Sequence, residues 1–311
     1  MRLLIILPGA IGDFILTLPS ILWIRQKLQP SWMELWVDRV NLELAAAGTQ
    51  AQKVLALAET GVDRWPPSEQ LFYHLTQFDQ VFSWRGALHS EWRQALEEHH
   101  SKIHFLPPIP QPCPQHAMDF RRFQVEALLG ADGHFPTYPE IHPPLEDVRH
   151  ARELLAPLNT GAHPYIMVHP GASGIRKRWP AASFAGVISR LLEGSYHVLL
   201  AEGPLDQGAV QEVLTVLGSR TMPGNLSRLR LDRLLGLAAL IRHCQACICN
   251  DSGIAHLAAA TGTPTLAIFT STDPTVWAPR GPHVRVLVRP GIEMVWEEVA
   301  AFAMDSRCPI S

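Results

Sequence analysis

The sequence predicts an α/β protein built from parallel sheets that are covered by helices on both faces. Two observations carry this prediction. Short apolar runs rich in β-forming residues alternate with helical patterns along most of the chain. Several of these runs, such as Leu3–Leu7 and Val198–Ala201, are apolar without alternation, which is typical of strands buried on both faces.

The predicted strands fall into two groups. The first comprises Arg2–Leu7, Met33–Val37, Val81–Trp84 and Ile103–Leu106. The second comprises Tyr165–His169, His197–Ala201, Ala246–Cys249 and Thr265–Phe269. Helices are predicted over Leu145–Leu158, Phe184–Leu192, Leu231–His243, Ile254–Thr261 and Glu293–Met304.

The length favours two domains. A chain of 311 residues is long for one domain and sufficient for two of roughly 150 residues each. Proline is dense in residues 107–114 and 136–144, and Asn159–Pro164 interrupts the chain before a new strand. We therefore predict an N-terminal domain of residues 1–155 and a C-terminal domain of residues 156–311.

Composition excludes several classes of protein. The chain has 26 Lys and Arg against 29 Asp and Glu and no block of like charge, which argues against binding nucleic acid through a basic surface. Its five cysteines, an odd number, do not suggest a disulfide framework. The apolar N-terminal run is interrupted by Pro8, Gly9 and Asp13. The uninterrupted run is therefore far shorter than the roughly 20 residues that a membrane-spanning helix needs. We expect a cytoplasmic protein.

Loops that follow strands are the places to look for a site, because ligands of open parallel sheets bind at the carboxyl ends of the strands. After the first strand, Gly9 and Gly12 permit a tight turn, and Asp13 falls near the start of a helix. Asp13 has two interpretations at this stage. It is either a helix-capping carboxylate or a general base at the mouth of the N-terminal sheet.

The loop after His169 combines small and basic residues. Gly171 and Ser173 allow backbone N–H groups to form an anion nest, and Arg176, Lys177 and Arg178 add positive charge. This combination suits a phosphate or diphosphate. The alternative is an ordinary solvated loop, since a basic triplet is usually a surface feature.

Two further strand ends carry polar residues. Glu202 is either a ligand for sugar hydroxyls or part of a Glu-Gly-Pro turn. The segment from Asp251 through Ser252 and Gly253 opens an alanine-rich helix whose free N–H groups can hold an anion. Thr272 and Asp273 lie in another polar loop at the same edge.

Metal and hydrolase chemistry are not favoured. Cys244, Cys247 and Cys249 have no second ligand pair at zinc-site spacing and are better explained as small buried thiols. The chain has no G-x-S-x-G nucleophile elbow and no Asp-x-Asp pair for a divalent cation. No metal site and no cofactor are predicted, so Lys177, nearby arginines and helix ends must meet any phosphate charge.

At this point the sequence resembles the glycosyltransferase family 9 enzymes, the ADP-heptose–lipopolysaccharide heptosyltransferases. Four motifs carry the resemblance, in the same order and at strand ends. They are Gly12-Asp13 with Leu18-Pro19; His169-Pro170-Gly171-Ala172 with Lys177-Arg178-Trp179-Pro180; Asn250-Asp251-Ser252-Gly253 with His256-Leu257-Ala258; and Phe269 with Thr272-Asp273-Pro274.

The resemblance implies a GT-B fold of two Rossmann-like domains, with the acceptor bound by the N-terminal one and the nucleotide sugar by the C-terminal one. It also implies that the last helix packs back on the N-terminal domain. The implied reaction is inverting, metal-independent transfer of heptose from ADP-heptose to a lipopolysaccharide-core glycan or a related acceptor. The implied setting is cytoplasmic, with peripheral contact at the inner membrane.

The family's functional residues carry over by position. Asp13 matches the catalytic base, and Gly9 and Gly12 match the acceptor loop. The donor residues that match are Lys177 at the diphosphate, Glu202 at the ribose, Asp251 at the sugar, and Ser252 and Gly253 at the phosphates. His256 either reaches the donor or braces its helix. Additional candidates around the phosphates are Gly171, Ser173, Arg176, Arg178, Thr272 and Asp273.

The sequence departs from the family pattern at two places, so alternatives stay open. Leu7-Pro8-Gly9 stands where an Arg or Lys is common, and Thr270-Ser271 stands where Gly-Pro is common. These changes put the substrates in question more than the reaction class. The alternatives are a transferase for another nucleotide sugar or a protein acceptor, an inactive nucleotide-sugar-binding protein, and a sugar epimerase.

Overall fold

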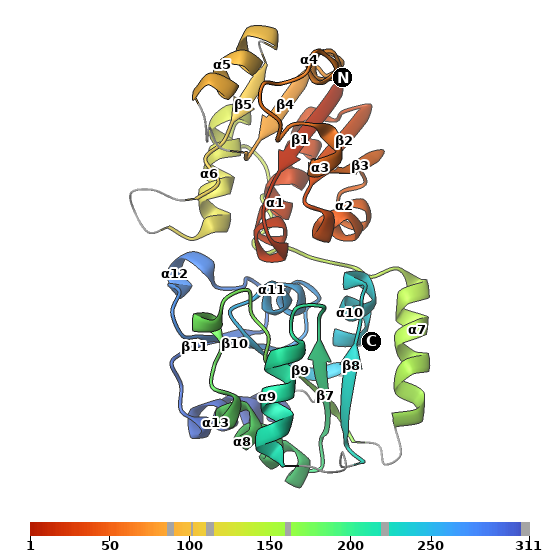
Figure 1. The fold of residues 1–311 in the computed structure, drawn as a ribbon, viewed down its shortest axis with the longest axis vertical. Coiled ribbons are helices and arrows are strands. Elements are labelled where there is room, and N and C mark those ends of the chain that lie inside the picture. The colour runs from red at the N-terminus through yellow and green to blue at the C-terminus, as the bar shows by residue number, and fades with distance from the viewer. Residues whose placement is uncertain (86–89, 101, 110–114, 159–162, 219–223, 306–311) are drawn as a thin grey trace. The chain divides into compact units, whose positions relative to one another are not determined.

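The computed structural model describes residues 1–85, 90–100, 102–109, 115–158, 163–218 and 224–305. The chain divides into two compact units, Met1–Pro139 and Glu140–Ser311. Each unit holds one sheet with helices packed on it (Figure 1). Of the proline-rich segment at 107–114, residues 110–114 lie outside the described residues.

The N-terminal unit is built on five parallel strands. They are β1 (Arg2–Leu7), β2 (Trp32–Val37), β3 (Lys53–Ala56), β4 (Gln80–Ser83) and β5 (Ile103–Phe105). Their order in the sheet is β3-β2-β1-β4-β5, and every pair is parallel. This is the order of a Rossmann-like sheet with one edge strand fewer, in which the chain starts in the middle and winds outwards in both directions.

Two layers of helices cover this sheet. The helices are α1 (Ile11–Leu28), α2 (Leu42–Thr49), α3 (Leu57–Thr60), α4 (Glu69–Leu75), α5 (Ser90–His99) and α6 (Ala117–Leu129). Leu57, Leu71 and Leu96 on α3, α4 and α5 pack into one core with Ile6 and Trp36 of the strands. Helix α1 packs against α2 and α6. Since both faces are covered, β1 and β2 are apolar almost throughout.

The C-terminal unit has six parallel strands. They are β6 (Tyr165–His169), β7 (His197–Glu202), β8 (Leu226–Arg230), β9 (Cys244–Asn250), β10 (Thr265–Phe269) and β11 (Val284–Val288). Their order is β11-β10-β9-β6-β7-β8. Read from the β8 edge, this is the strand order of a complete Rossmann sheet.

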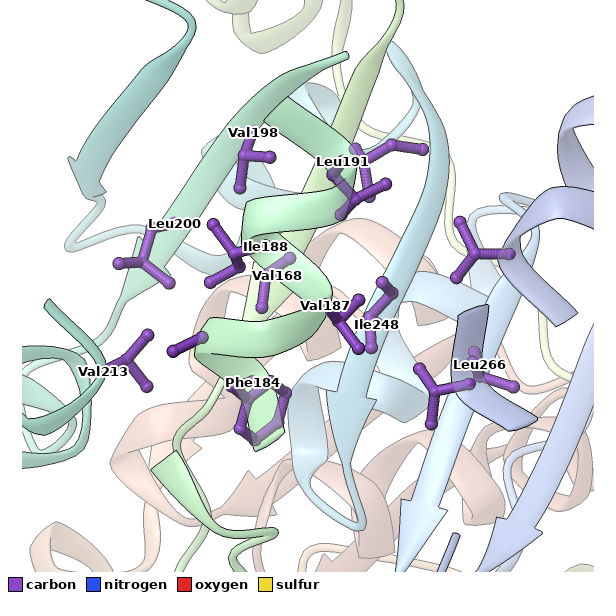
Figure 2. Close-up of a cluster of buried hydrophobic side chains, with 14 of the residues drawn as sticks. Val168, Phe184, Val187, Ile188, Leu191, Val198, Leu200, Val213, Ile248 and Leu266 are labelled. Atoms are coloured by element: carbon purple, nitrogen blue, oxygen red, sulfur yellow. The ribbon is translucent and has the colours of Figure 1, made fainter. Parts of the chain in front are cut away.

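The core of this unit lies between the sheet and α8. The helices are α7 (Leu145–Leu155), α8 (Ala181–Glu193), α9 (Gln207–Leu217), α10 (Leu234–Ile241), α11 (Gly253–Ala260), α12 (Pro274–Trp277) and α13 (Ile292–Asp305). Figure 2 shows Ile188 of α8 beside Val198 and Leu200 of β7, and Phe184 and Leu191 of the same helix belong to the same buried cluster. The apolar residues of α8 therefore form the buried stripe that its helical period predicts.

Every predicted strand is present, with boundaries within two residues, whereas β3, β8 and β11 were not predicted. The boundary between the units, at Pro139 and Glu140, also precedes the predicted one at residue 155. The reason is helix α7, which packs against α10, with Asp147 Oδ1 accepting from Arg233 Nη1 at 2.8 Å. Tyr165 Oη, at the start of β6, also donates to the Leu155 carbonyl at 3.1 Å.

The last helix contributes to the core of its own unit. Val295, Val299 and Phe302 of α13 belong to the buried core of the C-terminal unit, beside α8. The packing of this helix on the N-terminal domain stays a prediction. Among the described residues, no helix is both long enough and apolar enough to cross a membrane.

Candidate functional site

The two sheets each have one point where the strand order reverses. In the N-terminal unit it lies between β1 and β4, and in the C-terminal unit between β6 and β9. Ligands of such sheets bind at the carboxyl ends of the strands that flank this point. Asp13 follows β1, Lys177 follows β6 and Asp251 follows β9. The topology therefore brings these three candidates to the expected edge of their own sheets.

Asp13 lies in the first turn of α1 and is held by its own loop. Its Oδ2 accepts from the Ala10 N–H at 3.2 Å and so caps the start of the helix. Gly9 has φ +134°, and a Cβ there would lie 2.7 Å from the Asp13 Cβ. Gly9 is thus required for the approach of Asp13 to the loop. Asp13 does cap the helix, yet its side chain remains 32% exposed, so a substrate can still reach it.

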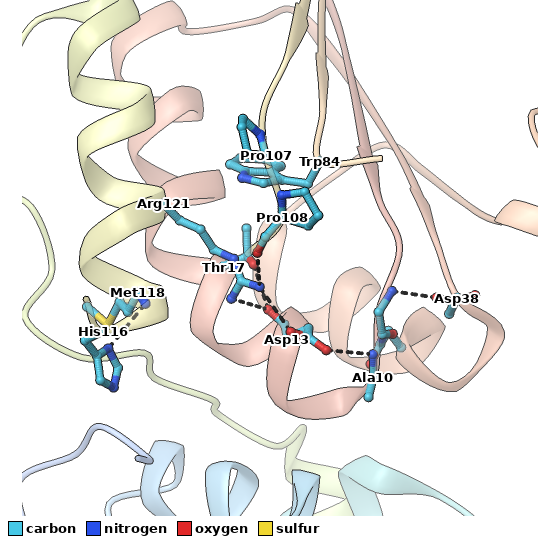
Figure 3. A network of polar contacts seen from close by, with 12 residues as sticks. Ala10, Asp13, Thr17, Asp38, Trp84, Pro107, Pro108, His116, Met118 and Arg121 are labelled. Atoms are coloured by element: carbon cyan, nitrogen blue, oxygen red, sulfur yellow. Dashed lines mark hydrogen bonds and ion pairs between the residues drawn. The ribbon is translucent and has the colours of Figure 1, made fainter. Parts of the chain in front are cut away.

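Arg121 was not predicted as a site residue, but it makes the strongest contact with Asp13. Its Nη2 donates to Asp13 Oδ1 at 3.1 Å and its Nη1 donates to the Asp13 carbonyl at 3.3 Å (Figure 3). Burial lowers the pKa of the Arg121 guanidinium, while the Asp13 carboxylate opposes that shift. The two residues are 108 positions apart, so no local pattern could pair them.

Three strand ends converge on Asp251 in the C-terminal unit. Lys177 Nζ, from the 3₁₀ helix Ile175–Lys177 after β6, is 2.8 Å from Asp251 Oδ2. Thr272, after β10, donates from Oγ1 to the same oxygen at 2.5 Å. The Asp251 side chain is only 4% exposed, against 30% for Lys177. The lysine therefore provides an accessible positive charge whose position a buried carboxylate fixes.

Asn250, part of the motif before α11, holds the loop that carries Lys177. It is fully buried, its Oδ1 accepts from the Trp179 N–H at 2.9 Å, and its Nδ2 donates to the Pro170 carbonyl at 2.8 Å. One amide side chain therefore joins both ends of the loop from Pro170 to Trp179. The sequence analysis quoted Asn250 in a motif without giving it this function.

A second buried network lies under the same loop. His169 Nε2 is 3.0 Å from Asp206 Oδ2, which also accepts from the Gly203 N–H at 3.1 Å. Burial on its own raises the pKa of the Asp206 carboxyl, but the hydrogen bonds and charges around it, His169 above all and also Arg178, hold that pKa below its usual value. Asp206 is therefore an ionised anchor for the loops after β6 and β7.

Gly171→Ala is expected to lower the free energy of unfolding by about 1–3 kcal/mol. A Cβ at Gly171 would lie 1.9 Å from Asp206 Oδ1, and His169 and Gly203 prevent that carboxylate from moving away. Urea denaturation followed by circular dichroism measures the change. Gly174→Ala in the same loop is the control, because its Cβ meets nothing within 4 Å. Equal stability of the two variants would contradict this account.

Glu202 is the last residue of β7 and is not in the predicted turn. Its Oε2 accepts from Arg228 Nε at 2.6 Å and from Arg228 Nη2 at 2.5 Å, and its side chain is 3% exposed. Arg228 was not predicted, because it lies on the unpredicted strand β8. Both bonds go to one of the two oxygens of the Glu202 carboxylate.

The remaining candidates are placed as follows. Ser252 precedes α11 and its side chain caps nothing, Gly253 begins that helix, and His256 is buried within it. Gly12 is the second residue of α1, and its role at the acceptor stays a prediction. Asp273 caps α12 through a 2.9 Å bond from the Thr275 N–H. Ser173 and Arg176 are exposed and Arg178 is half-buried.

Cys244, Cys247 and Cys249 are buried and free. Burial raises the pKa of the Cys249 thiol to about 12, so at neutral pH this thiol is protonated. Among the described residues, no group of three or more His, Cys, Asp or Glu side chains is arranged to hold a metal ion.

Comparison with known proteins identifies the family to which the sequence is similar. A sequence model of glycosyltransferase family 9 (heptosyltransferase) matches residues 117–295, more than half of the chain. Lipopolysaccharide heptosyltransferase 3 of Escherichia coli is 35% identical over 159 residues, which are 49% of this chain and 44% of that protein. This match therefore spans less than half of the relative. Lipopolysaccharide heptosyltransferase 1 of Pseudomonas aeruginosa is 26% identical over 305 residues, covering 88% of this chain and 80% of that protein.

The fold has a close match among solved structures. ADP-heptose LPS heptosyltransferase II of E. coli superimposes with a TM-score of 0.78 over 99% of this chain and 100% of that protein, at 18% identity. At this identity the likeness concerns the fold. It confirms the predicted class, two Rossmann-like parallel-sheet domains of the GT-B type.

Proposed function

The chain belongs to glycosyltransferase family 9, the heptosyltransferase family, and from this membership we propose that it is an inverting glycosyltransferase. The proposed donor is ADP-heptose, and the proposed acceptor is a lipopolysaccharide-core or related glycan. The curated relatives are heptosyltransferases for lipopolysaccharide, which supports this choice of sugar and acceptor. The proposed setting is the cytoplasm, with peripheral contact at the membrane that carries the acceptor.

The observation that carries the proposal is the cluster of Lys177, Asp251 and Thr272. It lies at the carboxyl edge of the C-terminal sheet, where a Rossmann-like sheet binds nucleotides. A lysine charge beside the start of α11 suits a diphosphate, because the free N–H groups of the helix add to the positive potential. We assign the donor to this unit.

In the proposed reaction, Asp13 is the general base. The acceptor hydroxyl gives its proton to the Asp13 carboxylate while its oxygen bonds to the anomeric carbon, on the face opposite the leaving diphosphate. The bond from that carbon to the phosphate oxygen breaks, so the configuration inverts. Lys177 and the start of α11 stabilise the charge that develops on ADP. These groups supply the positive charge, and the proposal therefore involves no metal ion.

Calorimetric titration with ADP-heptose tests the donor assignment, with a chelator present and with UDP- and GDP-sugars as competitors. We expect ADP-heptose to bind without metal and to be preferred over both competitors. Transfer is then tested with a heptose-deficient lipopolysaccharide core and analysis of the product by mass spectrometry.

Each other result has a definite meaning. Preference for a UDP- or GDP-sugar would keep the fold and refute ADP-heptose as the donor. A strict requirement for a divalent cation would refute the metal-independent mechanism. Binding of ADP-heptose with no transfer to any glycan would indicate a nucleotide-sugar-binding protein, and turnover of the donor sugar without any acceptor would indicate an epimerase.

A further inference from the structure

Arg121 is a buried arginine whose polar contacts converge on Asp13 and the loop beside it. Its side chain is 2% exposed. Besides its two bonds to Asp13, its Nη2 donates to the Pro108 carbonyl at 3.4 Å, after strand β5. Figure 3 shows the guanidinium reaching from α6 to the first turn of α1. The fork of one side chain thus joins α6, the start of α1 and the loop after β5.

A buried cation is costly in free energy unless it is paired and hydrogen-bonded. Apolar side chains could join α6 to α1 without this cost, as Met118 and Val125 are buried on the same helix. Gln124 also anchors α6 independently, since its Nε2 donates to the Pro107 carbonyl at 2.7 Å and its Oε1 accepts from Trp84 Nε1 at 3.0 Å. Packing alone therefore does not explain why an arginine stands at position 121.

The contacts restrain Asp13 at three atoms. Oδ1 accepts from Arg121, Oδ2 accepts from the Ala10 N–H, and the carbonyl accepts from Arg121 and from Thr17 Oγ1 at 2.6 Å. A carboxylate has about four lone-pair directions, and these contacts use one on each oxygen. The carboxylate is thus held in one rotamer while a lone pair on each oxygen remains for an incoming hydroxyl.

We propose that Arg121 is the positioning residue of the reaction, which holds the Asp13 carboxylate in the orientation that accepts the acceptor proton. This inference rests on the proposed function, because it requires Asp13 to be the base. Arg121 keeps its own protons throughout and acts only through Asp13. It also supplies, from α6, a positive charge beside Asp13 in a chain with no basic residue in the segment Pro8–Gly12.

The test measures transfer and donor binding separately in three variants, Arg121→Met, Arg121→Lys and Arg122→Met. We expect Arg121→Met to lower kcat by about 10²-fold, because misplacing a reacting group has a cost of that size. The KM and Kd for ADP-heptose should not change, since the proposed donor site lies in the other unit. Arg121→Lys keeps the charge without the fork and should recover part of kcat.

Arg122→Met is the matched control. Arg122 is the next residue on α6, but it is 43% exposed and pairs with Glu126 at 2.8 Å, so we expect its loss to leave kcat unchanged. A chemical rescue gives a second readout: guanidinium ion added to Arg121→Ala should raise kcat, and urea, which has the same shape without the charge, should not.

A double variant connects the effect to Asp13. In an Asp13→Asn background, Arg121→Met should lower transfer no further. An equal drop in that background, an unchanged kcat in Arg121→Met, or rescue by urea as well as by guanidinium would overturn the inference. If Arg121→Met does not fold, the Lys variant and the rescue decide. Absence of transfer by the wild type would instead refute the proposed function, and the inference with it.

Discussion

Asp13→Asn is expected to lower glycosyl transfer by about 10²–10⁴-fold, the usual contribution of a general base. Asparagine keeps the shape of the side chain and an oxygen that can accept from the Ala10 N–H, so the start of α1 should persist. It removes the ability to take a proton and also the negative charge that pairs with the buried Arg121, so a separate check of folding is needed. Initial rates with saturating ADP-heptose and acceptor measure the loss.

Donor binding separates this result from misfolding. Calorimetry should give the same Kd for ADP-heptose in Asp13→Asn and in the wild type, because Lys177 and Asp251 lie in the other unit. Asp132→Asn serves as the control carboxylate, since Asp132 is exposed and pairs with Lys27 at 2.8 Å in the same unit. Retention of more than about a tenth of the activity by Asp13→Asn would refute the catalytic assignment.

The middle of each sheet was predictable from the sequence, and most of the edges were not. The central strands β1, β6 and β9 are buried on both faces, so their apolar runs stand out. The three unpredicted strands, β3, β8 and β11, all lie at a sheet edge. An edge strand has a neighbour on one side only, and charged side chains are tolerated there.

The unpredicted strands show this effect directly. Strand β8 contains Arg228 and Arg230, and its residues alternate between more and less exposed positions. Strand β11 contains Arg285, and none of its residues is fully buried. Strand β3 has only four residues and begins with the exposed Lys53. Without a continuous apolar run, none of the three differs from a loop by local pattern.

The residues of the candidate site also fall into two groups, those that the sequence predicted and those that it did not. Asp13, Lys177 and Asp251 were identified because each follows a recognisable strand within a motif. Arg121 and Arg228 were missed because their partners lie 108 and 26 residues away, and only the fold brings them together. Asp206 precedes a helix, but its contacts with His169 and its closeness to Gly171 depend on how two loops pack.

Lys177→Met is expected to weaken binding of ADP by about 10–10²-fold, because a hydrogen bond to a charged group contributes about 1.5–3 kcal/mol. Lys177 is the only lysine of the C-terminal unit, and its ammonium is already oriented by the buried Asp251 carboxylate at 2.8 Å. The transfer rate should fall further, by about 10²–10³-fold, because the charge on the leaving diphosphate grows in the transition state.

The dependence of ADP binding on salt provides the sharper measurement. Since Lys177 contributes a full charge that is partly exposed, the wild type should lose affinity with rising ionic strength more steeply than Lys177→Met. Arg149→Met is the control, because this arginine is 78% exposed on α7 and pairs loosely with Glu153. A salt slope that Lys177→Met leaves unchanged would mean that the diphosphate is bound elsewhere. If Lys177→Met reduces the salt dependence of ADP binding and Arg149→Met does not change it, Lys177 is the residue that interacts with the phosphate charge.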